Sequence, residues 1–341
     1  MRSVINNQSG KLGTVLKGAV MGMILFFAAM VPAASTVHTS ISLLPGVTDV
    51  EVQHALDSLP ETGGEVVLPA GTIEVTRPIV LKRSHQSLRG AGASTLLRLA
   101  DRANCPVIIM GEPVNNPART LTGLRVSSLF IDGNRPNQQR ELWRESGEGS
   151  EIRNNGITVQ RVSGSAVEDV IIARCRSGGL VTTLGVERLV VRGLEAFDNE
   201  FDGLACYATT NSLFTDLNLH DNPGAGISLD LEFNGNVVSN AVLNANDLGI
   251  FMRSSRGNQF HGVSINRSRN HGVFMAHAEE TALLSACINN SFTDLQATNC
   301  GGAAFRINDA TCTDTTITRA RFDANAHGGL SLAQPELVVL R

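Results

Sequence analysis

A glycine that recurs every 23 or 24 residues is the feature of this sequence that most constrains its fold. The intervals between successive copies are 23, 24, 23, 23 and 23 residues, and an aliphatic residue follows each glycine. The copies are Gly156, Gly179, Gly203, Gly226, Gly249 and Gly272, with weaker ones at Ala303 and Gly329. So regular a period indicates stacked repeats, in which each repeat packs only against its neighbours.

Each repeat has the composition of one coil of a parallel β-helix. Short apolar runs are separated by Asn and Asp, and the period leaves no room for a helix. Strands of successive coils would then pair at roughly 4.8 Å. Alternation along one strand predicts that Ile227, Leu229 and Leu231 point inward and that Ser228 and Asp230 point outward. A leucine-rich repeat lacks support because its Leu/Asn signature is absent, and a β-propeller would need a longer repeat and more aromatic residues.

The N-terminus has the pattern of an export signal, predicted to span residues 1–33. An apolar stretch of twelve residues, 20–31, precedes small residues that permit cleavage after Ala33. The basic residues before it are Arg2, Lys11 and Lys17. Twelve apolar residues are fewer than the about 20 that a spanning helix needs, so we expect a cleaved leader, with an uncleaved membrane anchor as the alternative.

The remainder is predicted to be one domain, an all-β, single-stranded right-handed parallel β-helix over residues 46–341. Within it, residues 46–100 would form the N-terminal cap and first coils, 132–155 a long loop, and 156–341 the regular coils. Apolar residues at helical spacing in Val50–Leu59 predict a short amphipathic helix. Such a helix would cap the open end of the solenoid.

The net charge bears on the expected partner, and the cysteines bear on possible disulfide bonds. The formal net charge is −4, so a nucleic-acid partner is not expected, because phosphate contacts need a basic footprint. Six cysteines in an exported chain could form disulfides, and Cys287, Cys300 and Cys312 are the best candidates because they cluster. The sequence leaves their pairing open.

Residues 46–134 resemble the N-terminal region of the pectate-lyase-like β-helix superfamily. The resemblance rests on four segments: the helix around 52–56, Gly63–Gly71, Leu88–Gly92 and Ile131–Asn134. It implies the right-handed β-helix fold and carbohydrate-related function. It does not specify a reaction, because lyases, hydrolases, epimerases and non-catalytic proteins share these motifs.

Stacking of the repeats predicts a column of reactive side chains. The outward position four residues after each repeat glycine holds Tyr207, Asp230 and Arg253 on three consecutive coils, and Asp202 and His271 enter the same sheet. The proposed catalytic residues are Tyr207, Asp230, Arg253, His271 and Arg306. The alternative is a solvated ion-pair ladder between Asp230 and Arg253, which would contribute little energy.

Polygalacturonase-type hydrolases of the superfamily are the sharpest comparison, and the match is incomplete. Asp230, the segment 270–272 and the segment 306–308 fall where three of their motifs would. The coil expected to carry an Asp pair reads Ile250-Phe251-Met252-Arg253, without a carboxylate. Glycoside hydrolysis normally needs two carboxylates that flank the bond, so this chemistry is disfavoured, even with a displaced acid such as Glu232 or Asp202.

Elimination or C5 epimerisation of a uronate needs other groups, and the sequence contains them. Arg253 or Arg306 would neutralise the carboxylate, His271 would take the C5 proton, and Tyr207 would serve as the acid. We therefore expect an exported polysaccharide lyase or C5-epimerase that acts on a uronic-acid-containing polysaccharide. The alternative is a non-catalytic exported β-helix that binds glycan or another surface partner.

Further substrate contacts are predicted at Trp143, Asp202 and Asp132. Trp143 lies in the long loop and would stack on a sugar ring, or else pin the loop against the coils. The expected partner is an acidic polysaccharide in an extracytoplasmic compartment, with no membrane contact beyond an N-terminal anchor. No cofactor is required, although calcium stays open because its oxygen ligands can come together only in three dimensions. The oligomeric state is not predicted.

Overall fold

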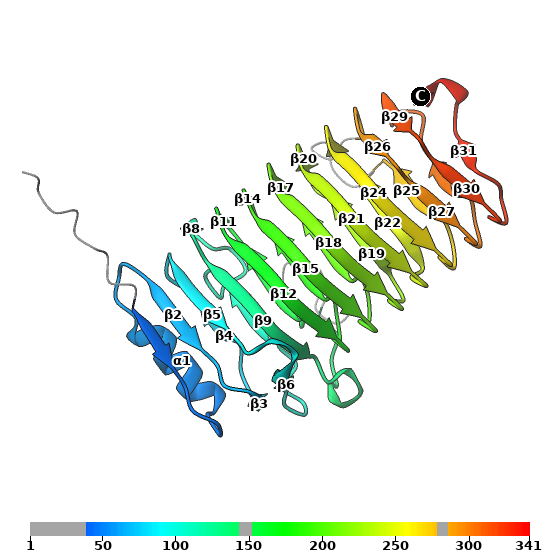
Figure 1. Cartoon of the computed structure of the whole chain (residues 1–341). Coiled ribbons are helices and arrows are strands. Elements are labelled where there is room, and N and C mark those ends of the chain that lie inside the picture. The colour runs from blue at the N-terminus through cyan, green and yellow to red at the C-terminus, as the bar shows by residue number, and fades with distance from the viewer. Residues whose placement is uncertain (1–38, 143–151, 278–285) are drawn as a thin grey trace, which may run out of the picture. The chain divides into compact units, whose positions relative to one another are not determined.

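The computed structural model describes residues 39–142, 152–277 and 286–341, and these residues form a stack of β-coils (Figure 1). Each strand pairs in parallel with its equivalent in the next coil, which produces three long sheets. This arrangement confirms the predicted parallel β-helix. The predicted leader, residues 1–33, and Trp143 lie outside the described residues. No helix within the described ranges is long and apolar enough to cross a membrane.

Sheet A, with 16 strands, is the largest. Its strands are β1 (Ser40–Ser42), β2 (Gly64–Val67), β3 (Gly71–Val75), β5 (Gln86–Arg89), β6 (Thr95–Leu99), β9 (Arg125–Asp132), β12 (Ala166–Ala173), β15 (Val190–Phe197), β18 (Leu213–His220), β21 (Val237–Asn244), β24 (Gln259–Asn266), β26 (Ser291–Thr293), β27 (Gln296–Thr298), β29 (Thr315–Thr318), β30 (Arg321–Asp323) and β32 (Val338–Leu340). Strand β1 pairs with β2, so pairing begins before the predicted start at residue 46.

Sheet B has 10 strands and carries the repeat glycines next to its strands. Its strands are β4 (Ile79–Leu81), β7 (Ile108–Met110), β10 (Ile157–Gln160), β13 (Leu180–Thr183), β16 (Leu204–Tyr207), β19 (Ala225–Asp230), β22 (Leu248–Arg253), β25 (Val273–Ala276), β28 (Phe305–Ile307) and β31 (Leu330–Leu332). The glycines are needed because the coils approach closely here. A Cβ on Gly249 would lie 2.4 Å from the carbonyl oxygen of Gly272.

Sheet C has 6 short strands, which form the third side of the coils between β8 and β23. Its strands are β8 (Leu121–Thr122), β11 (Val162–Ser163), β14 (Val186–Glu187), β17 (Thr209–Thr210), β20 (Phe233–Asn234) and β23 (Ser255–Arg256). Three short 3-10 segments complete the connections, at Gly92–Ser94, Arg135–Asn137 and Pro335–Leu337.

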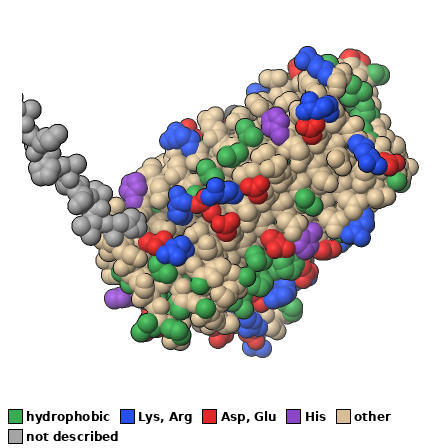
Figure 2. Space-filling view, viewed as in Figure 1, with side chains coloured by type: hydrophobic (Ala, Val, Ile, Leu, Met, Phe, Trp, Pro, Cys, Tyr) green, Lys and Arg blue, Asp and Glu red, His purple; other side chains and the backbone are tan. Residues whose placement is uncertain are grey.

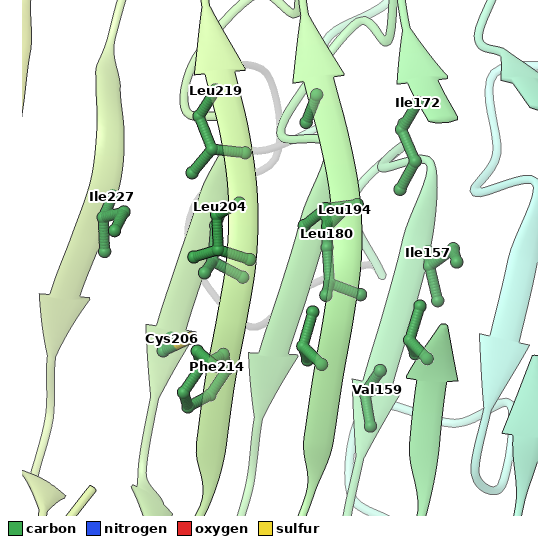
Figure 3. Packing of buried hydrophobic residues seen from close by; sticks show 14 of the residues in the cluster. Ile157, Val159, Ile172, Leu180, Leu194, Leu204, Cys206, Phe214, Leu219 and Ile227 are labelled. Atoms are coloured by element: carbon green, nitrogen blue, oxygen red, sulfur yellow. The ribbon is translucent and has the colours of Figure 1, made fainter. Parts of the chain in front are cut away.

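The core is a narrow apolar column between the sheets (Figure 3). Ile227 and Leu229 are fully buried, as the alternation predicts. Leu231 differs from the prediction, because β19 ends at Asp230 and Leu231 has a left-handed φ of 49°. It therefore lies in the turn and is only half-buried.

A ladder of buried asparagines holds the coils in register at one corner. The Oδ1 atom of Asn222 accepts hydrogen bonds from the backbone N–H and the Nδ2 of Asn199, at 3.2 and 3.1 Å. Its own Nδ2 donates to Oδ1 of Asn246 at 2.9 Å. These side chains satisfy turn backbone that the sheets leave unpaired, which is why asparagine recurs at this corner.

One helix, α1 (Asp49–Ser58), covers the N-terminal end of the coils, and it confirms the predicted cap. Thr48 and Glu51 form a capping box at its start, and Val52, Ala55 and Leu56 are buried. The apolar stripe that predicted the helix is therefore the surface that packs on the first coils.

Sheet A carries ion pairs between successive coils on its outer surface. Glu168 pairs with Arg125 in the preceding coil and with Arg192 in the next. In the face shown in Figure 2, charged side chains lie in small groups of both signs, and no single sign dominates. Exposed pairs of this kind contribute little energy each.

Candidate functional site

The outward face of sheet B brings together Tyr207, Asp230 and Arg253. They are the last residues of β16, β19 and β22, three neighbouring strands. Tyr207 and Asp230 are direct partners in the parallel register. The predicted column therefore exists, and its members are spaced by roughly 4.8 Å from coil to coil.

Asp230 is held by Arg253 in a largely buried ion pair. The Nε of Arg253 donates to Oδ2 of Asp230 at 2.8 Å, and Nη2 donates to the same oxygen. The other oxygen, Oδ1, accepts the backbone N–H of Leu231 at 2.8 Å. Asp230 is only 2% exposed, whereas the side chain of Arg253 is 31% exposed. Both oxygens of the carboxylate are therefore engaged, while the partly exposed guanidinium of Arg253 has further N–H groups.

Two phenylalanines form an aromatic surface beside this pair. The rings of Phe251 and Phe274 stack across neighbouring coils, with centroids 5.9 Å apart and planes 21° apart. Arg253 lies over Phe251, with Cζ 5.4 Å from the ring centroid. On the other side, the ring of His271 stacks on Phe274 at 5.6 Å. We call Phe251, Phe274 and His271 the aromatic platform.

His271 presents a hydrogen-bond donor at the edge of this platform. Its Nδ1 accepts the backbone N–H of Ala303 at 2.9 Å. Burial lowers the pKa of His271, and the positive charge of Arg306 lowers it further, so the ring is neutral at neutral pH. With Nδ1 engaged as an acceptor, the proton of the neutral ring resides on Nε2. This geometry favours a donor at Nε2 over the base that we expected from the sequence.

Arg306 supplies a positive charge next to the platform. It is the central residue of β28 and pairs in register with Phe274. Its Nε and Nη2 donate to Oδ1 of Asn308 at 3.3 and 2.8 Å. Within the described ranges, Arg306 makes no ion pair with an acidic side chain. The neutral amide of Asn308 leaves this charge uncompensated, so the surface beside Phe274 favours an anion.

The predicted catalytic residues thus form two groups. Tyr207, Asp230 and Arg253 lie at the ends of their strands, whereas His271 precedes β25 by two residues and Arg306 lies in the middle of β28. Phe251 and Phe274 connect the groups, and sequence reasoning missed both. A signal was available, because each phenylalanine lies two residues after a repeat glycine and the two are one period apart.

Asp202 and Asp132 lie apart from the platform. Asp202 occupies the same column as His271 but three coils away, roughly 14 Å. Its Oδ1 accepts the backbone N–H of Ala225 at 2.7 Å. Burial raises the pKa of Asp202 to about 6, although this N–H and Arg153 oppose the shift. Asp132 ends β9 on sheet A, where Arg174 and the backbone of Asn134 hold it.

A model of a known protein family matches part of the sequence. Residues 144–265 match the family model described as a right handed beta helix region. This match and the stacked parallel sheets identify the fold as a right-handed β-helix. No curated protein matches it in sequence.

Solved structures share this β-helix fold at low sequence identity. The ORF18 protein of Geobacillus virus E2 superposes with a TM-score of 0.65 at 15% identity, and the match covers 86% of this chain and 58% of that one. An alginate lyase from Paenibacillus superposes at 0.61 with 13% identity, covering 88% and 98%. An endo-xylogalacturonan hydrolase from Aspergillus tubingensis superposes at 0.55 with 16% identity, covering 89% and 95%. Identities this low show a common fold.

Elsewhere on the same face lies a depression with a volume of about 620 Å³. Val80 and Ile109 line it, and they continue the outward column toward Thr158. Prolines and Val114 make most of its other walls apolar. Among the described residues, no group of three or more His, Cys, Asp or Glu side chains could hold a metal ion.

Proposed function

We propose that the protein binds an acidic polysaccharide on the outer face of sheet B and acts on it by β-elimination or C5 epimerisation. The aromatic platform would contact the faces of sugar rings, and Arg306 would bind a uronate carboxylate. The proposal includes export of the chain, for which the predicted leader at residues 1–33 is the support.

The single observation that carries the proposal is the uncompensated charge of Arg306 beside Phe274. Aromatic rings and an arginine side by side match a uronate, which has an apolar ring face and a carboxylate. Sheet B repeats similar outward positions from coil to coil, so neighbouring sugars could lie on neighbouring coils. The alginate lyase and the xylogalacturonan hydrolase with this fold act, by their names, on polysaccharides.

The reaction would take place next to Arg253. Its guanidinium is partly exposed and has N–H groups beyond those that hold Asp230, so it would neutralise a second uronate carboxylate and make the C5 proton easier to remove. Tyr207, two coils away in the same column, would take the C5 proton as the phenolate. In elimination the C4–O bond then breaks as the C4=C5 double bond forms, and the phenol returns the proton to the leaving oxygen; in epimerisation water protonates the opposite face of C5. His271 would bind a sugar oxygen through Nε2–H, because Nδ1 already accepts from Ala303.

The test is to incubate the purified chain with pectate, alginate, glucuronan and glycosaminoglycans. Ultraviolet absorbance of an unsaturated uronate would report elimination, NMR would report C5 inversion, and calorimetry would report binding. Arg306→Gln should weaken binding by roughly tenfold or more, because a hydrogen bond to a charged group is lost. Tyr207→Phe should keep binding and lose product. Arg321→Gln, an exposed arginine on sheet A, is the matched control.

A non-catalytic glycan-binding protein is the second candidate. It is favoured by the hydrogen bonds that already occupy both oxygens of Asp230 and the Nδ1 of His271. This candidate predicts platform-dependent binding to a uronan without any product. The same occupation of Asp230 leaves no pair of available carboxylates here, so hydrolysis remains disfavoured. If no uronan binds, or if Arg306→Gln binds as tightly as the unaltered chain, the main proposal is wrong.

A further inference from the structure

Two buried cysteines meet across neighbouring coils near the end of sheet B. Ile288 forms a parallel bridge with Thr313, so the residues before them, Cys287 and Cys312, are also neighbours. The backbone N–H of Cys287 donates to Sγ of Cys312 at 3.4 Å, and the thiol of Cys287 donates to the carbonyl oxygen of Ala276 at 3.8 Å. Both side chains are fully buried.

The geometry of this pair suits a disulfide. Residues paired across neighbouring coils have Cα atoms roughly 4.8 Å apart. Disulfides need about 4.4–6.8 Å between Cα atoms and side chains that point toward each other. The Sγ atom of Cys312 accepts the backbone N–H of Cys287, so this thiol already points toward its neighbour in the adjacent coil.

The other clustered cysteine does not share this contact. The thiol of Cys300 donates to the carbonyl oxygen of Thr298, its own neighbour in sequence, at 3.6 Å. The sequence left open which of Cys287, Cys300 and Cys312 would pair. The structure distinguishes them, because only Cys287 and Cys312 face each other among these three.

We propose that Cys287 and Cys312 are joined by a disulfide when the chain folds in an oxidising environment. Each thiol loses its proton, one S–S bond forms, and two electrons pass to an oxidised disulfide such as oxidised glutathione, which becomes two thiols. The bond closes a loop that contains β26, β27 and β28. It therefore fastens the coil that carries Arg306 to its neighbour.

The bond must form during folding, because both thiols are buried in the finished coil and an oxidant cannot reach them. The test is to refold the reduced, urea-unfolded chain in a buffer of reduced and oxidised glutathione. The folded fraction is then unfolded in urea that contains N-ethylmaleimide, so that buried free thiols are blocked as well, and the protein is digested for mass spectrometry. In the folded fraction, we expect a cross-linked peptide pair with Cys287 and Cys312, while the other cysteines are alkylated.

Cysteine-to-serine variants identify which two thiols form the cross-link. Cys300→Ser should keep the cross-link, whereas Cys287→Ser and Cys312→Ser should each abolish it without creating another. The oxidised chain should melt several degrees above the reduced one, because the unfolded chain is constrained. A folded chain with both thiols alkylated, or with Cys300 in the cross-link, would overturn the proposal. If refolding fails, the same peptide map on chain exported to a bacterial periplasm decides the question. The inference does not depend on catalysis.

Discussion

The ring of His271 occupies the space beside Gly302 in the next coil, and a Cβ on Gly302 would lie 2.4 Å from its Nδ1. The neighbouring backbone N–H of Ala303 donates to that same nitrogen. The direction in which the Nε2 atom of His271 points therefore depends on the backbone of Gly302 and Ala303. Neither residue belongs to the aromatic platform. The imidazole of His271 fits there because Gly302 has no side chain.

Gly302→Ala should displace the ring of His271 while the fold persists, because the new methyl group cannot share space with Nδ1. We expect a shifted imidazole signal in NMR and uronan binding weakened by about tenfold, as for loss of a buried hydrogen bond. Circular dichroism should stay unchanged. His327→Ala removes an exposed imidazole nearby and serves as the control. An unmoved His271 signal in Gly302→Ala would contradict the expectation.

The aromatic platform can be tested by truncating its rings one at a time. Phe251→Ala and Phe274→Ala should each weaken binding of a uronan by about 3- to 10-fold, because stacking contacts contribute on the order of 1 kcal/mol. Calorimetry would measure the change. Phe197→Ala, which removes a ring stacked on His220 on sheet A, should leave binding intact. Equal losses in all three variants would point to general destabilisation.

The asparagine ladder should contribute strongly to stability. Asn222→Ala removes the acceptor for Asn199 and leaves buried backbone groups without partners, so we expect a loss of roughly 2–4 kcal/mol. Urea unfolding would measure it. Asn218→Ala is the matched control, because this exposed asparagine makes one hydrogen bond, to Glu195. If the two variants unfold at the same urea concentration, the ladder is not a stabilising element.

Stability should respond to the ionisation of Asp202, whose pKa is raised to about 6 by burial. The folded chain then holds this proton more tightly than the unfolded chain, in which the pKa is near 3.9. The stabilising contribution is therefore complete below about pH 4 and is lost as the pH rises through 6. Asp202→Asn should gain stability relative to the unaltered chain at pH 7 and show no such gain at pH 4.

NMR can check the same shift directly. The carboxyl carbon signal of Asp202 should titrate with a midpoint near 6 in the folded chain. A midpoint below 4 would show that the N–H of Ala225 and the charge of Arg153 outweigh burial.

The sequence was sufficient to predict the fold because its signals are local and periodic. The repeat glycines, the inward Ile227 and Leu229, and the apolar stripe of α1 all follow from spacing along the chain. Leu231 was assigned wrongly because alternation does not report where a strand ends. A left-handed turn residue such as Leu231 breaks the alternation without any change in residue type.

The site was harder to predict because contacts across coils depend on where each side chain lies along its strand. Tyr207, Asp230 and Arg253 share one offset from the repeat glycine, so their column could be deduced. Phe274 and Arg306 occupy equivalent positions in neighbouring coils, but 32 residues separate them instead of one 23-residue period, so the repeat did not reveal the pairing. His271 lies three residues before Phe274, and its ring contact depends on side-chain direction. The choice of Cys312 as the neighbour of Cys287 also required the register of an irregular coil.

The distance between Tyr207 and Arg306 is measured in whole coils of this solenoid. Gaining or losing one repeat between them would move the two groups apart or together by roughly 4.8 Å, while the surroundings of each stay the same. The length of ligand that spans the two groups can therefore change in fixed steps when a segment of DNA is duplicated or deleted. The residues around Tyr207 and around Arg306 need not change.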